Sequence, residues 1–127
     1  MTFKILYVED NPDNMHLIQK ALTARGYEVY GAVNGLDGVS MAEDLKPDMI
    51  LLDINLPDID GYEVARRIRK SLETSLHSVT IIAITANVLK GDAEKALAAG
   101  CDAYMPKPIN IHELWARVET YLSRDVG

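Results

Sequence analysis

The stretch from residue 47 to residue 61 reads PDMILLDINLPDIDG and contains the signals that decide the fold. Its apolar run at residues 49–52 lacks the polar alternation of a half-exposed strand and is too short for a helix, so it predicts a strand covered on both faces. The run ends at Asp53. Asp60 and Glu63 form the pattern of a helix start, because the first caps free backbone N–H groups and the second reaches back toward them. We therefore expect a buried strand, a short loop and a helix.

The same cycle of strand and helix repeats along the chain. Apolar runs at residues 5–8, 81–84 and 103–105 predict further buried strands, and the more polar residues 27–30 predict an edge strand. Between these runs, apolar residues recur at helical spacing. The stripes are Met15, Ile18 and Leu22; Leu36, Val39 and Ala42; Val64, Ile68 and Leu72; Leu89, Ala93, Ala96 and Leu97; and Ile111, Leu114, Trp115, Val118, Tyr121 and Leu122. Five alternations predict an α/β fold, a doubly wound parallel sheet with helices on both faces.

Composition limits the classes of protein. With 127 residues, 48% of them apolar and 25% charged, the chain has the size and make-up of one globular domain, which we expect to span residues 1–127. A net charge of −6 without any Lys/Arg block disfavours direct binding to nucleic acid or to a membrane. Cys101 has no second cysteine to pair with, and the first apolar run is too short for a signal peptide core. These features lead us to expect a cytoplasmic protein.

Functional side chains collect where the predicted strands end, and ligands of open α/β sheets bind at that edge. The side chains are Glu9, Asp10, Asp53, Thr85 and Lys107. Three neighbouring carboxylates repel one another and should recruit a cation, and Mg²⁺ prefers such oxygen ligands. Magnesium and the Lys107 ammonium together would balance the three carboxylates. A site of this kind suits phosphoryl transfer, with Asp53 as the nucleophile and with Thr85 and Lys107 holding phosphoryl oxygens.

The ordered set of motifs resembles the response-regulator receiver domain of two-component signalling, over nearly the whole chain. The motifs are Glu9-Asp10, Asp53, Leu56-Pro57, Asp60-Gly61, Thr85-Ala86, Tyr104 and Lys107-Pro108. The resemblance implies a flavodoxin-like fold of five strands and five helices, with the sheet order 2-1-3-4-5. It also implies a single-domain response regulator that is not a turnover enzyme. In such a protein, Asp53 accepts a phosphoryl group from a phosphohistidine, and the domain then switches its protein–protein contacts or relays the phosphoryl group.

The resemblance further implies the partners and the roles of other residues. The donor would be a sensor histidine kinase or a histidine phosphotransfer protein, and a separate effector protein would read the output from a monomer or weak dimer. Glu9, Asp10, Asp53 and the backbone carbonyl of Asn55 would bind Mg²⁺. The bond before Pro108 would be cis, and Thr85 and Tyr104 would be the switch residues.

Finer features narrow the type of receiver. The opening Glu9-Asp10-Asn11 with Asn14, and the segment at residues 90–92, look most like stand-alone cell-cycle receivers of the DivK type and receivers of hybrid kinases. Glu9 stands where aspartate is commoner in the family, and Ile59 where methionine is frequent. Asn55 and Asn87 occupy positions that affect how fast the acyl phosphate hydrolyses.

Three other functions compete with this interpretation. A flavin carrier is disfavoured because Glu9-Asp10 would repel the flavin phosphate. An aspartyl-phosphate phosphatase is disfavoured because it needs a second acid two residues after Asp53, where this chain has Asn55. A receiver-shaped interaction module that is never phosphorylated remains open.

Overall fold

The computed structural model describes residues 2–86 and 91–124, and its elements alternate as the sequence predicts. The strands are β1 (Lys4–Val8), β2 (Glu28–Ala32), β3 (Met49–Asp53), β4 (Thr80–Thr85) and β5 (Ala103–Pro106). The helices are α1 (Pro12–Thr23), α2 (Gly35–Leu45), α3 (Gly61–Arg69), α4 (Asp92–Ala99) and α5 (Ile111–Arg124), and a short 3-10 helix η1 (Thr74–His77) precedes β4.

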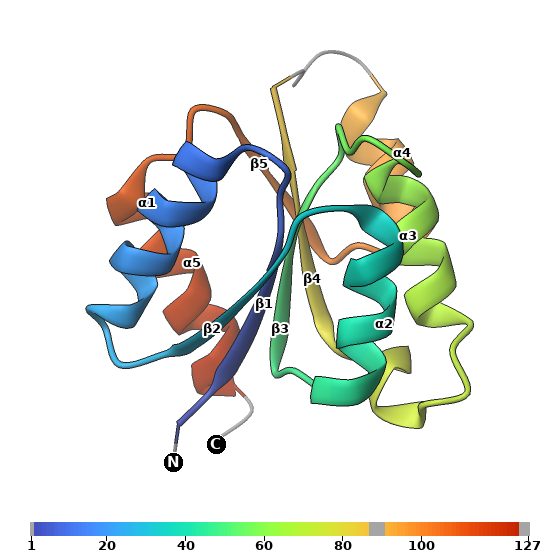
Figure 1. Cartoon of the computed structure of the whole chain (residues 1–127), viewed down its shortest axis with the longest axis horizontal. Coiled ribbons are helices and arrows are strands. Elements are labelled where there is room, and N and C mark those ends of the chain that lie inside the picture. The colour runs from blue at the N-terminus through green and yellow to red at the C-terminus, as the bar shows by residue number, and fades with distance from the viewer. Residues whose placement is uncertain (1, 87–90, 125–127) are drawn as a thin grey trace.

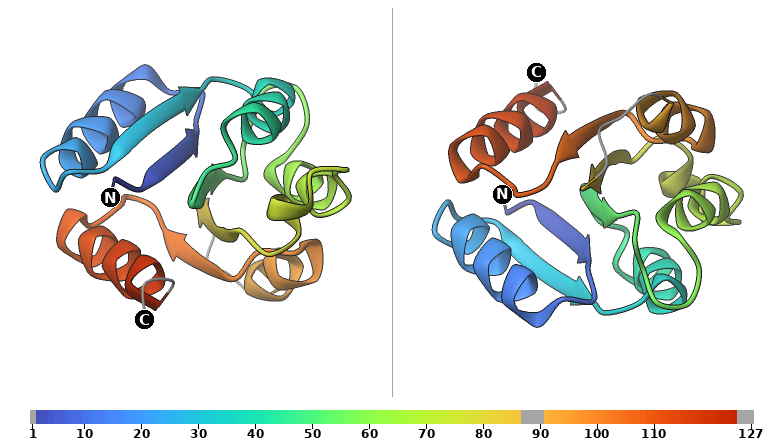
Figure 2. Two further views of the ribbon diagram at one scale, coloured as in Figure 1. Left: turned by 90° about the horizontal axis from the view of Figure 1, so that it is seen from below. Right: turned by 90° about the horizontal axis from the view of Figure 1, so that it is seen from above.

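The five strands form one parallel sheet in the order β2-β1-β3-β4-β5, which confirms the predicted fold. Helices α1 and α5 cover one face of the sheet, and α2, α3 and α4 cover the other (Figures 1 and 2). Because every strand runs in the same direction, all five carboxyl ends lie at one edge. This edge is where the site is built.

Alternating strand residues divide the core into two layers. In β3, Met49 and Leu51 pack with α1 and α5, whereas Ile50 and Leu52 pack with α2, α3 and α4. All five residues of β3 are buried. An uninterrupted apolar run is therefore required here, because each face of the strand carries its own layer of helices.

Asparagine and aspartate caps fix where the helices begin. The side chains of Asn11, Asn34 and Asp60 accept hydrogen bonds from backbone N–H groups in the first turns of α1, α2 and α3. Asn110 does the same for Glu113 at the start of α5, at 3.0 Å. Each cap satisfies a donor that the helix itself leaves unpaired and so sets the helix boundary.

The structure differs from the sequence-based expectations in a few places. Leu72 continues the α3 stripe by spacing, but α3 ends at Arg69 and the Leu72 side chain is 98% exposed. Leu36 and Leu97 lie on helical stripes and are nevertheless half-exposed. The predicted polar loop before β4 contains η1, whose Leu76 is fully buried. Leu89 lies outside the described residues.

No helix within residues 2–86 and 91–124 combines the length and the apolar content that crossing a membrane requires.

Candidate functional site

The ends of β1 and β3 bring three acids together. Glu9, Asp10 and Asp53 each offer a carboxylate oxygen, and these oxygens lie within 4.8 Å of one another. Glu9 and Asp53 are 1% exposed, whereas Asp10 is open to solvent. The pairing of Val8 with Leu52 in neighbouring parallel strands explains this proximity, because the next residue of each segment, Glu9 or Asp53, then lies beside the other at the same edge of the sheet.

Lys107 adds a positive charge to this group of acids. Its ammonium nitrogen lies 2.7 Å from Asp53 Oδ2 and 3.4 Å from Glu9 Oε1. The backbone N–H of Lys107 donates to the carbonyl of Thr85 at 2.8 Å, which joins the end of β5 to the end of β4. The Lys107–Pro108 peptide bond is cis. The site therefore combines three carboxylates and one ammonium from three strand ends.

The carboxylates also accept hydrogen bonds from neutral donors. Glu9 Oε1 accepts from the Tyr7 hydroxyl at 3.1 Å and from the Asn14 side-chain amide at 3.3 Å, and Glu9 Oε2 accepts from the Asn11 backbone at 3.3 Å. Asp53 Oδ1 accepts from the Asn55 backbone N–H at 3.1 Å. These bonds hold two buried acids in fixed orientations.

Burial and like charge shift the ionisation of the group. Desolvation, followed by the hydrogen bond and the negative charge of Asp53, raises the pKa of Glu9. Partial burial disfavours the Lys107 ammonium, but the hydrogen bond to Asp53 and the charges of Asp53 and Glu9 outweigh it and raise the pKa of Lys107. The site is therefore short of positive charge when no other cation is present.

The remaining residues predicted for the site lie at different distances from it. Thr85 is 4% exposed at the end of β4, in register with Pro106. Asn55 lies two residues after Asp53, in the loop that follows β3. Tyr104 lies apart from the acids: its side chain is 36% exposed and lines a hollow of about 460 Å³ with Leu97 and Arg117. Asn87 lies outside the described residues, as does Lys90 of the segment at residues 90–92.

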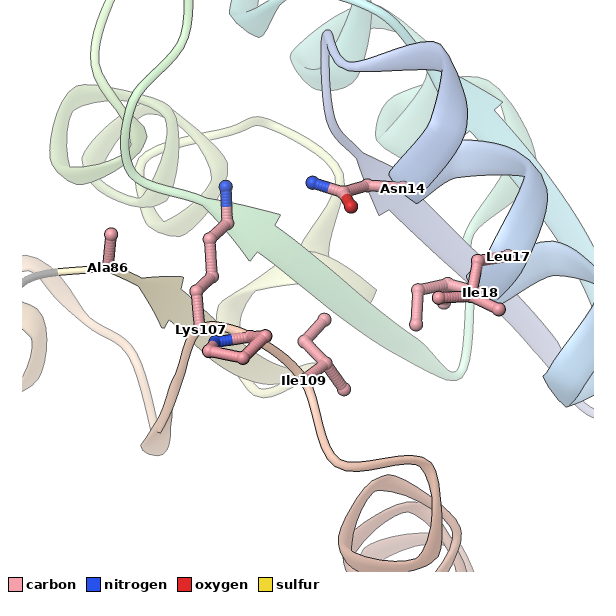
Figure 3. A pocket seen from close by; sticks show the side chains of 7 residues that line it. Asn14, Leu17, Ile18, Ala86, Lys107 and Ile109 are labelled. Carbon is pink, nitrogen blue, oxygen red and sulfur yellow. The ribbon is translucent and has the colours of Figure 1, made fainter.

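A second cavity adjoins the acids on the α1 side. It has a volume of about 360 Å³ and is lined by Asn14, Leu17, Ile18, Ala86, Lys107, Pro108 and Ile109. In Figure 3 the Asn14 amide points toward the Lys107 ammonium at one end, and aliphatic side chains line the rest. An apolar recess therefore opens beside the charged site.

Sequence reasoning missed Tyr7 as a residue of this site. In the sequence it belongs to the apolar run at residues 5–8, and in the structure it is fully buried. Its hydroxyl reaches Glu9 because side chains two residues apart lie on the same face of a strand. A tyrosine two positions before a buried acid was the available signal.

The comparisons with known proteins agree with this geometry. The family model described as the response regulator receiver domain matches residues 5–119. The chain belongs to the response-regulator receiver family. As the sequence indicated, it is therefore a two-component signalling protein rather than a conventional enzyme.

Individual relatives indicate which kinds of receiver this chain is similar to. The chain is 38% identical over 122 residues to the polar-differentiation response regulator DivK of Brucella anthropi, covering 96% of this chain and 98% of that one. Among solved structures, it is similar to the receiver domain of sensor histidine kinase PA1611 from Pseudomonas aeruginosa, with 39% identity, a TM-score of 0.88 and coverage of 97% and 99%. That structure is described as having a magnesium ion coordinated in the active site cleft. Both types of relative predicted from the sequence are confirmed.

A two-component response regulator from Clostridium difficile shares the same fold. Its structure matches with a TM-score of 0.91 and 28% identity, and covers 99% of this chain and 100% of that one. The receiver architecture therefore extends over nearly the whole chain.

Proposed function

We propose that this chain is a single receiver domain, residues 1–127, in which Asp53 accepts a phosphoryl group from a phosphohistidine in a Mg²⁺-dependent reaction. The observation that carries the proposal is the group of three carboxylates within 4.8 Å, with Lys107 bonded to Asp53. The histidine would belong to a sensor histidine kinase or a histidine phosphotransfer protein. As is typical of the family, we assign the protein to the cytoplasm.

The donor set fits a magnesium ion. Hard cations take oxygen ligands, and Mg²⁺ binds a few protein oxygens, directly or through water, while retaining water and substrate oxygens. Glu9, Asp10 and Asp53 would supply carboxylate oxygens, and Asn55 would supply its backbone carbonyl. When bound, the ion neutralises charge that develops on the phosphoryl group.

The chain's own residues would perform the transfer as follows. An oxygen of Asp53 forms a bond to phosphorus while the N–P bond of the donor breaks, and the imidazole nitrogen keeps the electron pair. The Thr85 hydroxyl and the Lys107 ammonium hold phosphoryl oxygens and stabilise the transferred group. Lys107 already lies 2.7 Å from Asp53, so only a short movement is needed.

The output would be a change of surface that an effector protein reads. We assign the switch to Thr85 and Tyr104: Thr85 shifts toward the phosphoryl group, and the outward Tyr104 side chain turns inward. The hollow that Tyr104 lines with Leu97 and Arg117 supports this assignment, because the inward turn would reshape the face of α4, β5 and α5. This is a population shift driven by contacts made only in the phosphorylated state.

A small phosphodonor tests the proposal directly. After incubation with acetyl phosphate and Mg²⁺, intact-mass measurement should show one added phosphoryl group on the wild type and none on Asp53→Asn, and a chelator should prevent the gain. Asp58→Asn, in the same loop but outside the group of acids, should gain the group like the wild type. Equal labelling of Asp53→Asn would contradict the assignment, and no labelling of any variant would favour an interaction module that is never phosphorylated.

A further inference from the structure

One carboxylate oxygen of Glu9, Oε1, lies close to three donor groups. Oε1 lies 3.1 Å from the Tyr7 hydroxyl, 3.3 Å from the Asn14 amide nitrogen and 3.4 Å from the Lys107 ammonium. Oε2 accepts the backbone N–H of Asn11 at 3.3 Å. The two oxygens of the same carboxylate therefore have different surroundings.

The Tyr7 contact comes from inside the core. The Tyr7 side chain is fully buried among the apolar residues that β1 shares with α1 and α5. A phenol hydroxyl in such surroundings needs a hydrogen-bond partner, and the carboxylate of Glu9 supplies it. The Asn14 contact comes instead from the first turns of α1, at the rim of the apolar recess. The two donors thus approach Glu9 from two different elements.

We propose that Tyr7 and Asn14 are positioning residues that fix Oε1 of Glu9 and leave Oε2 available to the cation. The proposal rests on the Mg²⁺ binding of the proposed function. Glutamate has one more rotatable bond than aspartate, so a free Glu9 would lose more side-chain entropy when it binds a cation. Donors that orient a ligating carboxylate in advance remove part of that cost, and their loss weakens metal binding.

The geometry makes this role specific to glutamate. An aspartate at position 9 is shorter by one methylene, so its carboxylate would lie beyond hydrogen-bond distance of the Tyr7 hydroxyl. Removing that hydroxyl should therefore weaken Mg²⁺ binding when residue 9 is glutamate and leave it unchanged when residue 9 is aspartate. If Tyr7→Phe acted only by disturbing the core, it would instead change the Mg²⁺ affinity equally in the wild-type and Glu9→Asp backgrounds, because the core around the ring is the same in both.

Calorimetric titration of the metal-free protein with Mg²⁺, without a phosphodonor, tests the proposal. Tyr7→Phe should raise the dissociation constant about tenfold in the wild-type background and leave it unchanged in the Glu9→Asp background. Asn14→Ala, at a half-buried position, should also weaken binding and serves as a second variant if Tyr7→Phe folds poorly. Tyr30→Phe is the matched control, because it removes a tyrosine–glutamate bond of 3.4 Å to Glu28 on the edge strand.

The outcomes separate this proposal from the proposed function. Wild-type affinity in both Tyr7→Phe and Asn14→Ala, or an equal loss in the wild-type and Glu9→Asp backgrounds, would overturn the positioning role even if Asp53 is phosphorylated. A loss confined to the wild-type background would support it even if no phosphoryl group is accepted. A wild type that binds no Mg²⁺ would overturn both.

Discussion

At the scale of single residues, Lys107 compensates part of the charge of two buried acids. Replacing it by methionine removes the bonds to Asp53 and Glu9, so we expect the metal-free protein to lose about 2 kcal/mol of unfolding free energy. We also expect Mg²⁺ to bind the Lys107→Met variant more tightly, because the ammonium no longer competes with the ion. Urea denaturation and calorimetric titration measure the two effects.

A matched lysine controls for the loss of charge alone. Lys46 lies 3.6 Å from Glu73, and its side chain is 60% exposed. Lys46→Met should change the unfolding free energy by less than about 1 kcal/mol, as is usual for surface pairs. A metal-free Lys107→Met that is as stable as the wild type would contradict the view that Lys107 compensates buried charge.

The chemistry-bearing residues were largely predictable at this scale, and the residues that support them were not. Glu9, Asp10, Asp53 and Lys107 follow apolar runs, so strand ends alone indicate that they meet. Tyr7 belongs to such a run, and its hydrogen bond to Glu9 depends on side-chain orientation within the folded core. Sequence patterns report burial better than they report which polar atom a buried residue reaches.

At the scale of elements, Asp58 ties the loop after β3 to the start of α2. Its two carboxylate oxygens each accept a backbone N–H at 2.8 Å, one from Gly35 and one from Leu36. Desolvation is the largest single effect and raises the pKa of Asp58. Hydrogen bonds from the backbone N–H groups of Leu36, Gly35, Ile59 and Asp58 itself together outweigh it and lower the pKa below its ordinary value of 3.8. Charged Asp58 therefore stabilises the folded chain.

The pH dependence of the folding stability follows from the lowered pKa of Asp58. A carboxyl whose pKa is lower in the folded state contributes stability above its unfolded pKa and loses it as the pH falls through the folded value. Asp58→Ala should thus be less stable than the wild type at neutral pH, and the difference should shrink below about pH 3.8. Urea denaturation of both proteins over a pH series measures this, and a difference that is independent of pH would refute it.

Arg69 connects α3 to η1 and to the loop between α4 and β5. From the last turn of α3 it donates to the carbonyls of Gly100 and Leu76 at 2.9 Å each and to Asp102 at 3.1 Å. Because Arg69→Leu leaves these acceptors without that donor, we expect a loss of about 2–3 kcal/mol in denaturant unfolding. Arg67→Leu removes a surface pair with Glu63 and should cost less than about 1 kcal/mol. Equal losses in the two variants would contradict the special role of Arg69.

Element type was easier to predict than element length. Four strands and the five helices follow from apolar runs and helical spacing, whereas β2 was predicted from the more polar residues 27–30 and is observed at Glu28–Ala32. The α3 stripe extends by spacing to Leu72, beyond the observed end at Arg69. Periodicity indicates which face of a helix is apolar and contains no stop signal of its own. The turn of η1 was missed for a related reason, since a single buried leucine, Leu76, is too little to form a pattern.

At the scale of the whole molecule, the cation site exists only in the folded chain, because β1 and β3 supply its ligands from distant segments. A ligand that binds only the folded state stabilises it by about 2.7 kcal/mol at a hundredfold excess over its dissociation constant. The urea midpoint of the wild type should therefore rise with Mg²⁺ concentration. It should keep rising at concentrations above those that saturate the site in the calorimetric titration. A midpoint that does not change over that range would mean that the acids do not bind the ion in the folded state.

The central claim is that Asp53, among the three neighbouring acids, becomes the acyl phosphate. Borohydride reduces an aspartyl phosphate to homoserine, so reduction of the phosphorylated protein followed by peptide mass spectrometry identifies the residue that was modified. The account predicts homoserine at position 53 and aspartate still at position 10. Homoserine at position 10, or a phosphoryl group that borohydride leaves in place, would contradict it.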